Sequence, residues 1–288
     1  MSADISRSAD TMDQAKGEPE AARPVDPIVS DSALDGLKQS FRLWRFWVSM
    51  AWADWRRRYR RSLLGASWVF ISFGLFIAVK VVIFGAMSQQ ELGFFAIWLA
   101  VGFLAWTYIS SNIVEGCNVF INSERWIKGA NLPYMVYIYQ SVVRNIIQFV
   151  LSLGVVLIAL VFVPPPDPIM ALTALLSLPV YVISALWVQL LLAVICARFR
   201  DIVHLAQTIV RLLFFLTPIL WVPADFGVFG QYADYNPFTH YLAIMREPLV
   251  SGVFPVLSWI VVGAMTLGGS VLAIAVFKLN RKRIVFWI

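Results

Sequence analysis

Charged side chains are scarce in this sequence, because only 14% of its 288 residues are Asp, Glu, Lys or Arg while 60% are hydrophobic. A water-soluble domain of this length does not need so large an apolar excess for one core. The composition therefore excludes an ordinary soluble enzyme and predicts an integral membrane protein. The net charge of +6 does not indicate nucleic-acid binding, since the basic residues stand at the ends of apolar runs.

Residues that hold metals, form disulfides or bind nucleotides are also few. The two cysteines, Cys117 and Cys196, lie far apart, and they indicate neither a disulfide framework nor a metal site. His204 and His240 are expected on opposite sides of the membrane, so they cannot share a ligand. No Gly-x-x-x-x-Gly-Lys-Ser/Thr is present, which excludes that route to a bound nucleotide. We expect no catalytic residue, metal or cofactor in this chain.

Long apolar runs make up most of what remains. Six of them approach or exceed the ~20 residues that cross the hydrocarbon core of a bilayer. They cover roughly Leu64 to Met87, Phe94 to Val114, Tyr137 to Val163, Ile169 to Cys196, Val203 to Val222 and Phe254 to Phe277. The predicted fold class is all-α, with six transmembrane helices.

The distribution of Lys and Arg predicts the orientation of these helices. Cytoplasmic flanks are enriched in basic residues. With both termini inside, the cytoplasmic pieces carry Arg42, Arg45, Arg56, Arg57, Arg58, Arg60, Arg61, Arg125, Lys128, Arg198, Arg200, Lys278, Arg281, Lys282 and Arg283, and the external pieces carry only Arg246. We therefore expect both termini in the cytoplasm.

The N-terminal part divides into a tail and an interfacial helix. Residues 1–40 hold eight acidic and four basic side chains and no aromatic residue, which is typical of a disordered cytoplasmic tail. Between Asp35 and Trp55, apolar residues recur every three or four positions, at Leu37, Phe41, Trp44, Val48, Ala51 and Trp55. This pattern predicts an amphipathic helix in the headgroup plane. The alternative is an extension of the first spanning helix.

Three basic residues, Lys80, Arg144 and Arg211, fall inside the apolar runs, whereas acidic residues are missing from them. A charge at membrane depth normally faces a partner or a wet cavity. Arg144 stands with Asn145 and Gln148, which favours a water-lined face, although contact between helices is also possible. Lys80 either snorkels to the headgroups or faces such a cavity. The missing carboxylates argue against a proton relay.

Aromatic residues supply a second set of channel candidates. Trp106 and Tyr108 in the second run and Tyr137 in the third could line a path for sugars, because flat rings pack against the apolar faces of pyranoses. The alternative is an interfacial belt or lipid-facing packing.

Two short helices are expected outside the spans. The segment from Asn122 to Pro133 can be capped by Asn122 or Ser123, and it exposes Trp126 and Ile127 for a partner's groove or for the membrane surface. The segment from Asn236 to Pro248 predicts a helix bounded by two prolines, which either covers an exit or anchors its loop.

Several of these motifs, in this order and spacing, resemble the ABC-2 type permeases that export polysaccharides. They are Arg58-Tyr59-Arg60-Arg61-Ser62-Leu63-Leu64-Gly65 followed by Trp68, the Asn122 to Pro133 segment, Arg198-Phe199-Arg200-Asp201, Thr217-Pro218-Ile219-Leu220-Trp221, and Asn236-Pro237 leading to Arg246. The resemblance runs from about Phe41 to the C-terminus, so we expect a transmembrane domain over residues 41–288.

The resemblance implies a homodimer in the bacterial inner membrane, paired with a separate ABC ATPase subunit that binds ATP and Mg²⁺. It implies a coupling helix that includes Asn122, Glu124, Arg125, Trp126, Ile127 and Lys128. Short re-entrant helices before the last span, with Asn236, Pro237, Tyr241 and Arg246, would guard the exit.

The function expected from this resemblance is ATP-driven export of a lipid-linked or lipid-anchored polysaccharide of the capsule or O-antigen type. Arg58, Tyr59, Arg60 and Arg61 would then form the substrate entry, where the three arginines meet the phosphate of the lipid carrier; for the arginines, the alternative role is topology alone. Export of a drug or another lipid is an alternative function. A membrane glycosyltransferase is another alternative, and its catalytic group would come from Asp225, Asp234, His240 or Glu247.

Overall fold

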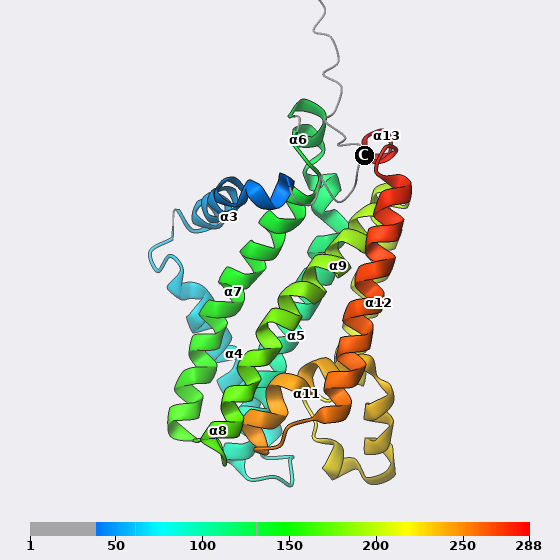
Figure 1. Cartoon of the computed structure of the whole chain (residues 1–288). Helices are drawn as coiled ribbons and strands as arrows, with labels where there is room; N and C mark the ends of the chain where they lie inside the picture. Colours follow the sequence, from blue (N-terminus) through cyan, green and yellow to red (C-terminus); the bar gives the residue numbers. More distant parts are fainter. Residues whose placement is uncertain (1–38, 61, 131) are drawn as a thin grey trace, which may run out of the picture.

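The structure is a computed structural model that describes residues 39–60, 62–130 and 132–288, and it shows a bundle of helices in this part of the chain (Figure 1). Most of the predicted acidic tail and Arg61 lie outside the described residues. The class predicted from the sequence, an all-α membrane-spanning protein, is confirmed.

Within the residues that the structure describes, five stretches are long and apolar enough to cross a membrane. Four of them are the single helices α4 (Ser67–Gly85), α5 (Leu92–Asn122), α7 (Met135–Phe162) and α12 (Val256–Asn280). The fifth stretch joins α8 (Pro168–Ala171), the 3₁₀ helix η1 (Leu172–Leu176) and α9 (Ser177–Arg198).

The sixth predicted span is shorter than expected. Helix α10 (Ile202–Leu216) has 15 residues, which corresponds to about 22 Å at 1.5 Å per residue. The prediction that this helix continues to Val222 was wrong. Proline disfavours helical geometry in the residue before it, and Thr217 accordingly turns extended ahead of Pro218.

Helix α5 occupies the centre of the bundle. It packs against α4, α7, α9, α10 and α11 (Pro237–Val250). Gly116 allows the close approach of α5 to α9, since a Cβ there would lie 2.8 Å from the Cα of Gln189. The outer helix α4 has only Val69 and Ile77 buried, so most of its apolar surface is left for lipid or for another chain.

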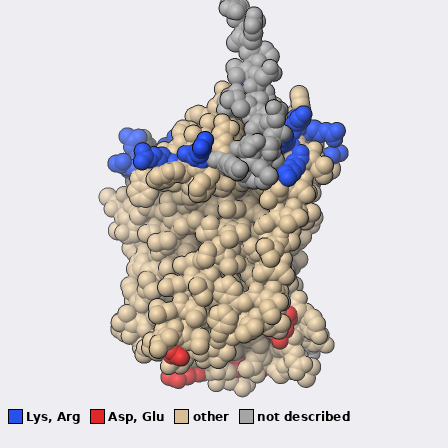
Figure 2. Space-filling view, viewed as in Figure 1, with Lys and Arg blue, Asp and Glu red and all other residues tan. Residues whose placement is uncertain are grey.

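The two ends of the bundle differ in charge. Figure 2 shows Lys and Arg gathered at one end, Asp and Glu at the other, and a belt without charges between them. We call these the basic end and the acidic end. Helices α3 (Trp44–Tyr59), α6 (Glu124–Gly129) and α13 (Ile284–Trp287) lie at the basic end, and α8 and α11 lie at the acidic end (Figure 1). The positive-inside rule predicts that the basic end faces the cytoplasm.

The shorter elements differ in detail from the sequence predictions. Helix α3 lies across the basic end and continues beyond the predicted end at Trp55, to Tyr59 (Figure 1). The helix expected between Pro237 and Pro248 is present as α11, but it continues to Val250, with Pro248 inside it. A 3₁₀ segment, η2 (Pro223–Tyr235), joins the end of α10 to α11.

Candidate functional site

A polar cavity of about 470 Å³ opens at the basic end, where α3, α5, α6 and α7 meet. Both charged and uncharged polar side chains line it. They are Asp54, Arg57 and Arg58 from α3, Glu115, Asn118 and Asn122 from α5, and Gln140, Ser141 and Arg144 from α7, together with Ser123, Trp126 and Tyr137. Three of these residues are basic and two are acidic, which leaves one positive charge in excess and favours an anionic ligand.

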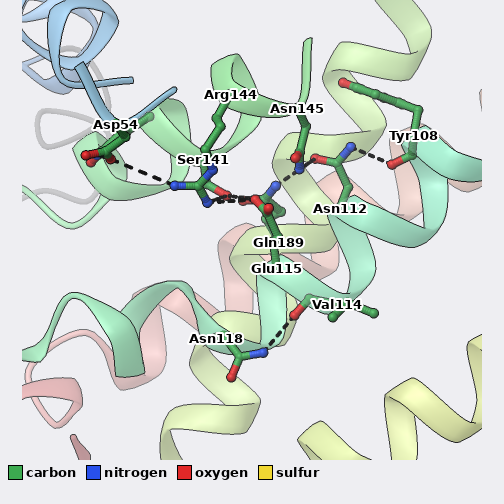
Figure 3. Close-up of polar contacts among 11 residues, drawn as sticks. Asp54, Tyr108, Asn112, Val114, Glu115, Asn118, Ser141, Arg144, Asn145 and Gln189 are labelled. Atoms are coloured by element: carbon green, nitrogen blue, oxygen red, sulfur yellow. Dashed lines mark hydrogen bonds and ion pairs between the residues drawn. The ribbon is translucent and has the colours of Figure 1, made fainter. Parts of the chain in front are cut away.

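Arg144 is the charged centre of this cavity. Its Nη2 lies 2.7 Å from Oε2 of Glu115 on α5, and its Nη1 lies 3.9 Å from Oδ2 of Asp54 on α3 (Figure 3). Ser141 donates a hydrogen bond of 3.1 Å to the same oxygen of Glu115. Both ionic partners therefore come from other helices, and they compensate a charge that water reaches only in part.

Asp54 joins the interfacial helix to the bundle. Its carboxylate accepts hydrogen bonds from Gln140 on α7 and from Arg57 one turn further along α3. Arg58 lines the cavity without an ion pair within 4.0 Å among the described residues. Arg58 is thus the basic side chain here that is most available to an anion.

Below the cavity, three amides join three helices. Asn112 on α5 accepts hydrogen bonds from Nδ2 of Asn145 on α7 at 3.1 Å and from Nε2 of Gln189 on α9 at 2.6 Å (Figure 3). It donates to the backbone oxygen of Tyr108 at 2.8 Å. This arrangement satisfies most of the polar atoms, so we interpret it as contact between helices rather than as a ligand site.

The structure brings together some of the predicted site residues and separates others. Arg58, Asn122, Trp126, Tyr137 and Arg144 line the one polar cavity. Other predicted residues are not among its lining residues. These are Tyr59, Arg60, Glu124, Arg125, Ile127, Lys128, Trp106 and Tyr108, and Arg61 lies outside the described residues.

Trp106 and Tyr108 pack elsewhere in the bundle. The ring of Trp106 lies 6.0 Å from that of Phe214 and 5.8 Å from that of Phe238. Tyr108 lines a second cavity of about 350 Å³ between α5, α9 and α10. The surface of this second cavity is almost wholly apolar, which makes it a poor place for a sugar.

Sequence reasoning missed Asp54 and Glu115 as partners of Arg144, and it missed the amides of Asn112 and Gln189. For Glu115 a signal was available in the sequence. Glu115 borders the cytoplasmic end of the second predicted span, and Arg144 lies near the cytoplasmic end of the third, so the sequence implies a similar depth for the two. No pattern in the sequence marks Asn112 and Gln189 as neighbours.

The short helix α6 projects from the basic end beside the cavity (Figure 1). Lys128 lies 2.8 Å from Oε1 of Glu124 and donates to the backbone oxygen of Ile288 at 2.7 Å. The hydrogen bond from Lys128, with its positive charge, lowers the pKa of Glu124. These contacts hold α6 against the C-terminal segment that contains α13.

Two expectations for α6 were wrong and one is confirmed. Ser123 precedes the helix, but its side chain makes no capping hydrogen bond. Ile127 is half-buried and packs against the core, because α6 rests on the bundle with that face. Trp126 is 57% exposed, as expected.

The remaining intramembrane charges have different surroundings. The Nζ of Lys80 lies 4.5 Å from the centroid of the Phe76 ring and 5.4 Å from that of Phe103, so cation–π contacts stabilise it. Arg211 is exposed on the outer face of α10.

At the acidic end, Asn236 caps α11 by accepting from the backbone N–H of Phe238 at 3.0 Å. Tyr241 is buried, and its hydroxyl lies 3.2 Å from Oγ1 of Thr266. Arg246, which the sequence analysis places on the external side of the membrane, is also buried within the protein. The reason is that α11 packs against α5 and turns this side chain into the protein.

Comparison with known proteins identifies the family. Residues 45–250 match the model of the ABC-2 type transporter family. The O-antigen export system permease protein RfbA of Myxococcus xanthus is 28% identical over 175 residues, which cover 60% of this chain and 67% of that protein. The protein of the same name from Klebsiella pneumoniae is 24% identical over 208 residues, which cover 69% of this chain and 78% of the relative.

In such systems ATP binding lies on a separate ATPase, which agrees with the missing nucleotide-binding motif. The matched region contains α4, α5, α7, α9, α10 and α11 and every charged residue of the polar cavity. The chain therefore belongs to the ABC-2 type transporter family and is a multi-pass membrane permease, a transporter subunit without catalytic activity.

Proposed function

We propose that this permease exports a lipid-linked or lipid-anchored polysaccharide, of the capsule or O-antigen type, across a bacterial inner membrane. The two RfbA proteins are named as O-antigen export permeases, which supports this substrate class. The observation that carries the proposal is the polar cavity, whose excess of positive charge lies where α3 meets the bundle.

The cavity suits the head of a lipid-linked glycan. Helix α3 exposes Trp44 and Trp52, and Phe41 is exposed just before it; these side chains favour the membrane interface. Arg58 follows them on the same helix and lines the cavity. A carrier phosphate at headgroup level would thus meet a guanidinium as it leaves the leaflet. Tyr59 and Arg60 lie beside this entrance, and Arg61 follows them in the sequence.

Helix α6 would dock the ATPase subunit that supplies the energy. Arg125 and Trp126 are exposed on it, and Asn122 and Trp126 also line the cavity. Movement of α6 by the ATPase would therefore change the shape of the cavity directly. Glu124, Ile127 and Lys128 would hold α6 in place through the contacts described above.

The outer face of α10 supports a homodimer. Arg211, Thr208 and His204 are exposed on this face, three or four residues apart and so on one side of the helix. This stripe is polar and carries one charge, at Arg211, which is costly against lipid tails. A second copy of the chain packed against α10 would shield this stripe from lipid. The passage for the substrate would then lie between the two copies.

The exit would lie at the acidic end, where α11 with Asn236, Pro237, Tyr241 and Arg246 covers the ends of α5 and α10. Within the bundle, Arg144 and Tyr137 are the candidates for contact with the glycan, because they line the polar cavity. Trp106 and Tyr108, which the sequence also suggested, lie in apolar surroundings outside that cavity.

Replacing Arg58 by Gln tests the substrate proposal. We expect surface glycan to fall several-fold while the amount of permease in the membrane stays unchanged, because the phosphate loses a charge-assisted hydrogen bond. Arg45→Gln is the matched control, since Arg45 lies on the same helix and does not line the cavity. Unchanged export in Arg58→Gln would remove the phosphate role.

Purification from native membranes tests the partner and the alternatives. We expect an ABC ATPase to co-purify in equal amount and the purified complex to be stimulated by a lipid-linked glycan. Stimulation by drugs or by phospholipids alone would favour the alternative substrates.

A further inference from the structure

The polypeptide leaves helical geometry after α10, at Thr217 and Pro218. Two side chains from α11 and its cap contact this helix break. Helix α10 ends at Leu216, Thr217 is extended, and Pro218 has no N–H to donate. Helix ends leave backbone carbonyls without partners inside the helix, and these need partners from elsewhere. At this break Thr217 and Trp221 donate to the carbonyls of Leu213 and Phe215 in α10, while the residues that follow the helix, Thr217 and Pro218, accept hydrogen bonds from α11 and its cap.

Arg246 provides the first attachment. Its Nη1 donates a 2.6 Å hydrogen bond to the backbone oxygen of Pro218. Its guanidinium lies over the indole of Trp98 on α5, with Cζ 3.3 Å from the ring centroid. The side chain is only 1% exposed, so water contributes little to its solvation.

This burial is costly for a charged group. Within the part of the chain that the structure describes, no carboxylate oxygen lies within 4.0 Å of Arg246. An apolar residue of similar size would avoid the desolvation of a charge. The guanidinium therefore requires an explanation other than packing, and its hydrogen bond to the break supplies one.

Asn236 provides the second attachment. While its Oδ1 caps α11, its Nδ2 donates a 2.9 Å hydrogen bond to Oγ1 of Thr217. That hydroxyl in turn donates to the backbone oxygen of Leu213 in α10, at 2.7 Å. One short helix thus holds two consecutive residues, Thr217 and Pro218, through its N-cap Asn236 and through Arg246 in its C-terminal half.

We propose that Asn236 and Arg246 clamp α11 to the end of α10, so that these two elements move as one rigid unit when the permease opens at the acidic end. Arg246 is then a positioning residue: it fixes α11 relative to the break and does not touch the transported molecule. The role of the clamp in transport rests on the proposed export function. The contacts that form the clamp do not depend on that function.

The clamp has a consequence for coupling. Helix α10 begins two residues after Arg200, and the residue that follows its other end, Thr217, meets the cap of α11 at the acidic end. A tilt of α10 that starts at the basic end would move α11 with it. No separate signal to the exit helix would be needed.

The first test is thiol labelling at Ile219, which is fully buried beside the clamp. Ile219→Cys, in the full chain with its ATPase in native membranes, is treated with a membrane-impermeant maleimide. We expect slow labelling in this background and about tenfold faster labelling after Arg246→Met, the size of effect that loss of a buried hydrogen bond produces. The labelling rate of Arg246→Lys should lie between those of the parent and of Arg246→Met, because Lys donates a hydrogen bond but has no planar group to stack on Trp98. Glu247→Gln is the matched control and should label like the parent.

The second test asks whether Arg246 acts by position. Cysteines replace Thr217 and Asn236, whose side chains already meet, and an oxidant such as copper phenanthroline forms the disulfide between α10 and α11. We expect the oxidised Thr217→Cys/Asn236→Cys permease to export at least as much glycan as the reduced one. In the Arg246→Met background, oxidation should restore export and slow the labelling of Ile219→Cys.

Two outcomes would overturn the clamp. One is a disulfide that blocks export, since α11 would then have to move relative to α10. The other is labelling of Ile219→Cys that Arg246→Met leaves unchanged. If the Arg246→Met variant fails to accumulate, export by the oxidised Thr217→Cys/Asn236→Cys permease, with Arg246 retained, still tests the clamp. A permease that exports no glycan but shows the labelling pattern refutes the proposed substrate and leaves the clamp intact.

Discussion

Arg144 shows how this chain accommodates a charge inside an apolar helix. Its nearest ionic partner, Glu115, is 29 positions away in sequence and on another helix. Each of the two side chains is about one quarter exposed, so solvent screens the pair only in part. The pair therefore contributes to the contact between α5 and α7, provided that both members are present.

We expect Glu115→Gln to destabilise the permease by about 1–3 kcal/mol, because Arg144 loses its closest carboxylate. Arg144→Gln should have a similar effect, and the double variant should recover part of it. The measurement is thermal unfolding in detergent, analysed as a double-mutant cycle. Additive single effects would show that the two side chains are not coupled. Asn118→Ala, which removes another side chain of the cavity, serves as the control.

Glu124 gives a pH dependence of known sign. Its pKa is lowered from the ordinary value of 4.5, mainly by the hydrogen bond from Lys128. A lowered pKa in the folded state means that the stabilisation is complete above pH 4.5 and is lost as the pH falls through the folded-state pKa. We expect hydrogen-exchange protection of α6 to decrease over that acid range. Glu124→Gln should lack this step, and a step of equal size in that variant would contradict the assignment to Glu124.

Helix α3 is attached to α7 by the carboxylate of Asp54 and by the ring of Trp47, which lies 5.3 Å from that of Tyr139. Asp54 connects it to Gln140 and Arg144 of α7, while Ala51 is its buried apolar contact. Asp54→Asn should therefore loosen α3 without unfolding the bundle. We expect faster hydrogen exchange in α3 and unchanged exchange in α5. Ser49→Ala is the control, because Ser49 bonds only within α3. Equal protection of α3 in Asp54→Asn and in the parent would exclude this role.

The sequence predicts some features of these helices better than others. The difference depends on which interaction sets the end of each helix or its orientation in the bundle. Apolar run length depends on composition alone, so it located the long helices. The end of α10 was predicted wrongly because Leu220, Trp221 and Val222 continue the apolar run although Pro218 has already stopped the helix. Hydropathy does not include that backbone restriction.

Contacts between helices are harder to predict, because the rotation of each helix about its axis follows from packing. The sequence marked Arg144 as unusual and could not name Glu115 or Asp54 as its partners. It also left Ile127 exposed, since the resting face of α6 is decided by residues far away in the chain. For the candidate site, the sequence therefore predicted which types of residue are present. It predicted only in part which of them lie together in one cavity.

For the whole molecule, the separation of charge between the two ends agrees with one orientation in the membrane (Figure 2). The outer surface raises the further question of which apolar faces meet lipid and which meet a second copy. Exposed leucines occur on α10 and α12 alike, so apolar exposure does not distinguish these faces. The charge of Arg211 does, because α12 exposes no Arg or Lys between Val256 and Phe277.

We expect Arg211→Cys to form a disulfide-linked dimer on mild oxidation in native membranes, because two copies would bring their α10 faces together. Leu267→Cys on α12 is the matched control, since Leu267 is 72% exposed on an apolar face and should remain monomeric. The native Cys117 and Cys196 are buried and are replaced by serine in both variants. Gel mobility without reductant measures the outcome. A dimer formed through Leu267→Cys and not through Arg211→Cys would place the second copy against α12, and the polar stripe of α10 would then need a different partner.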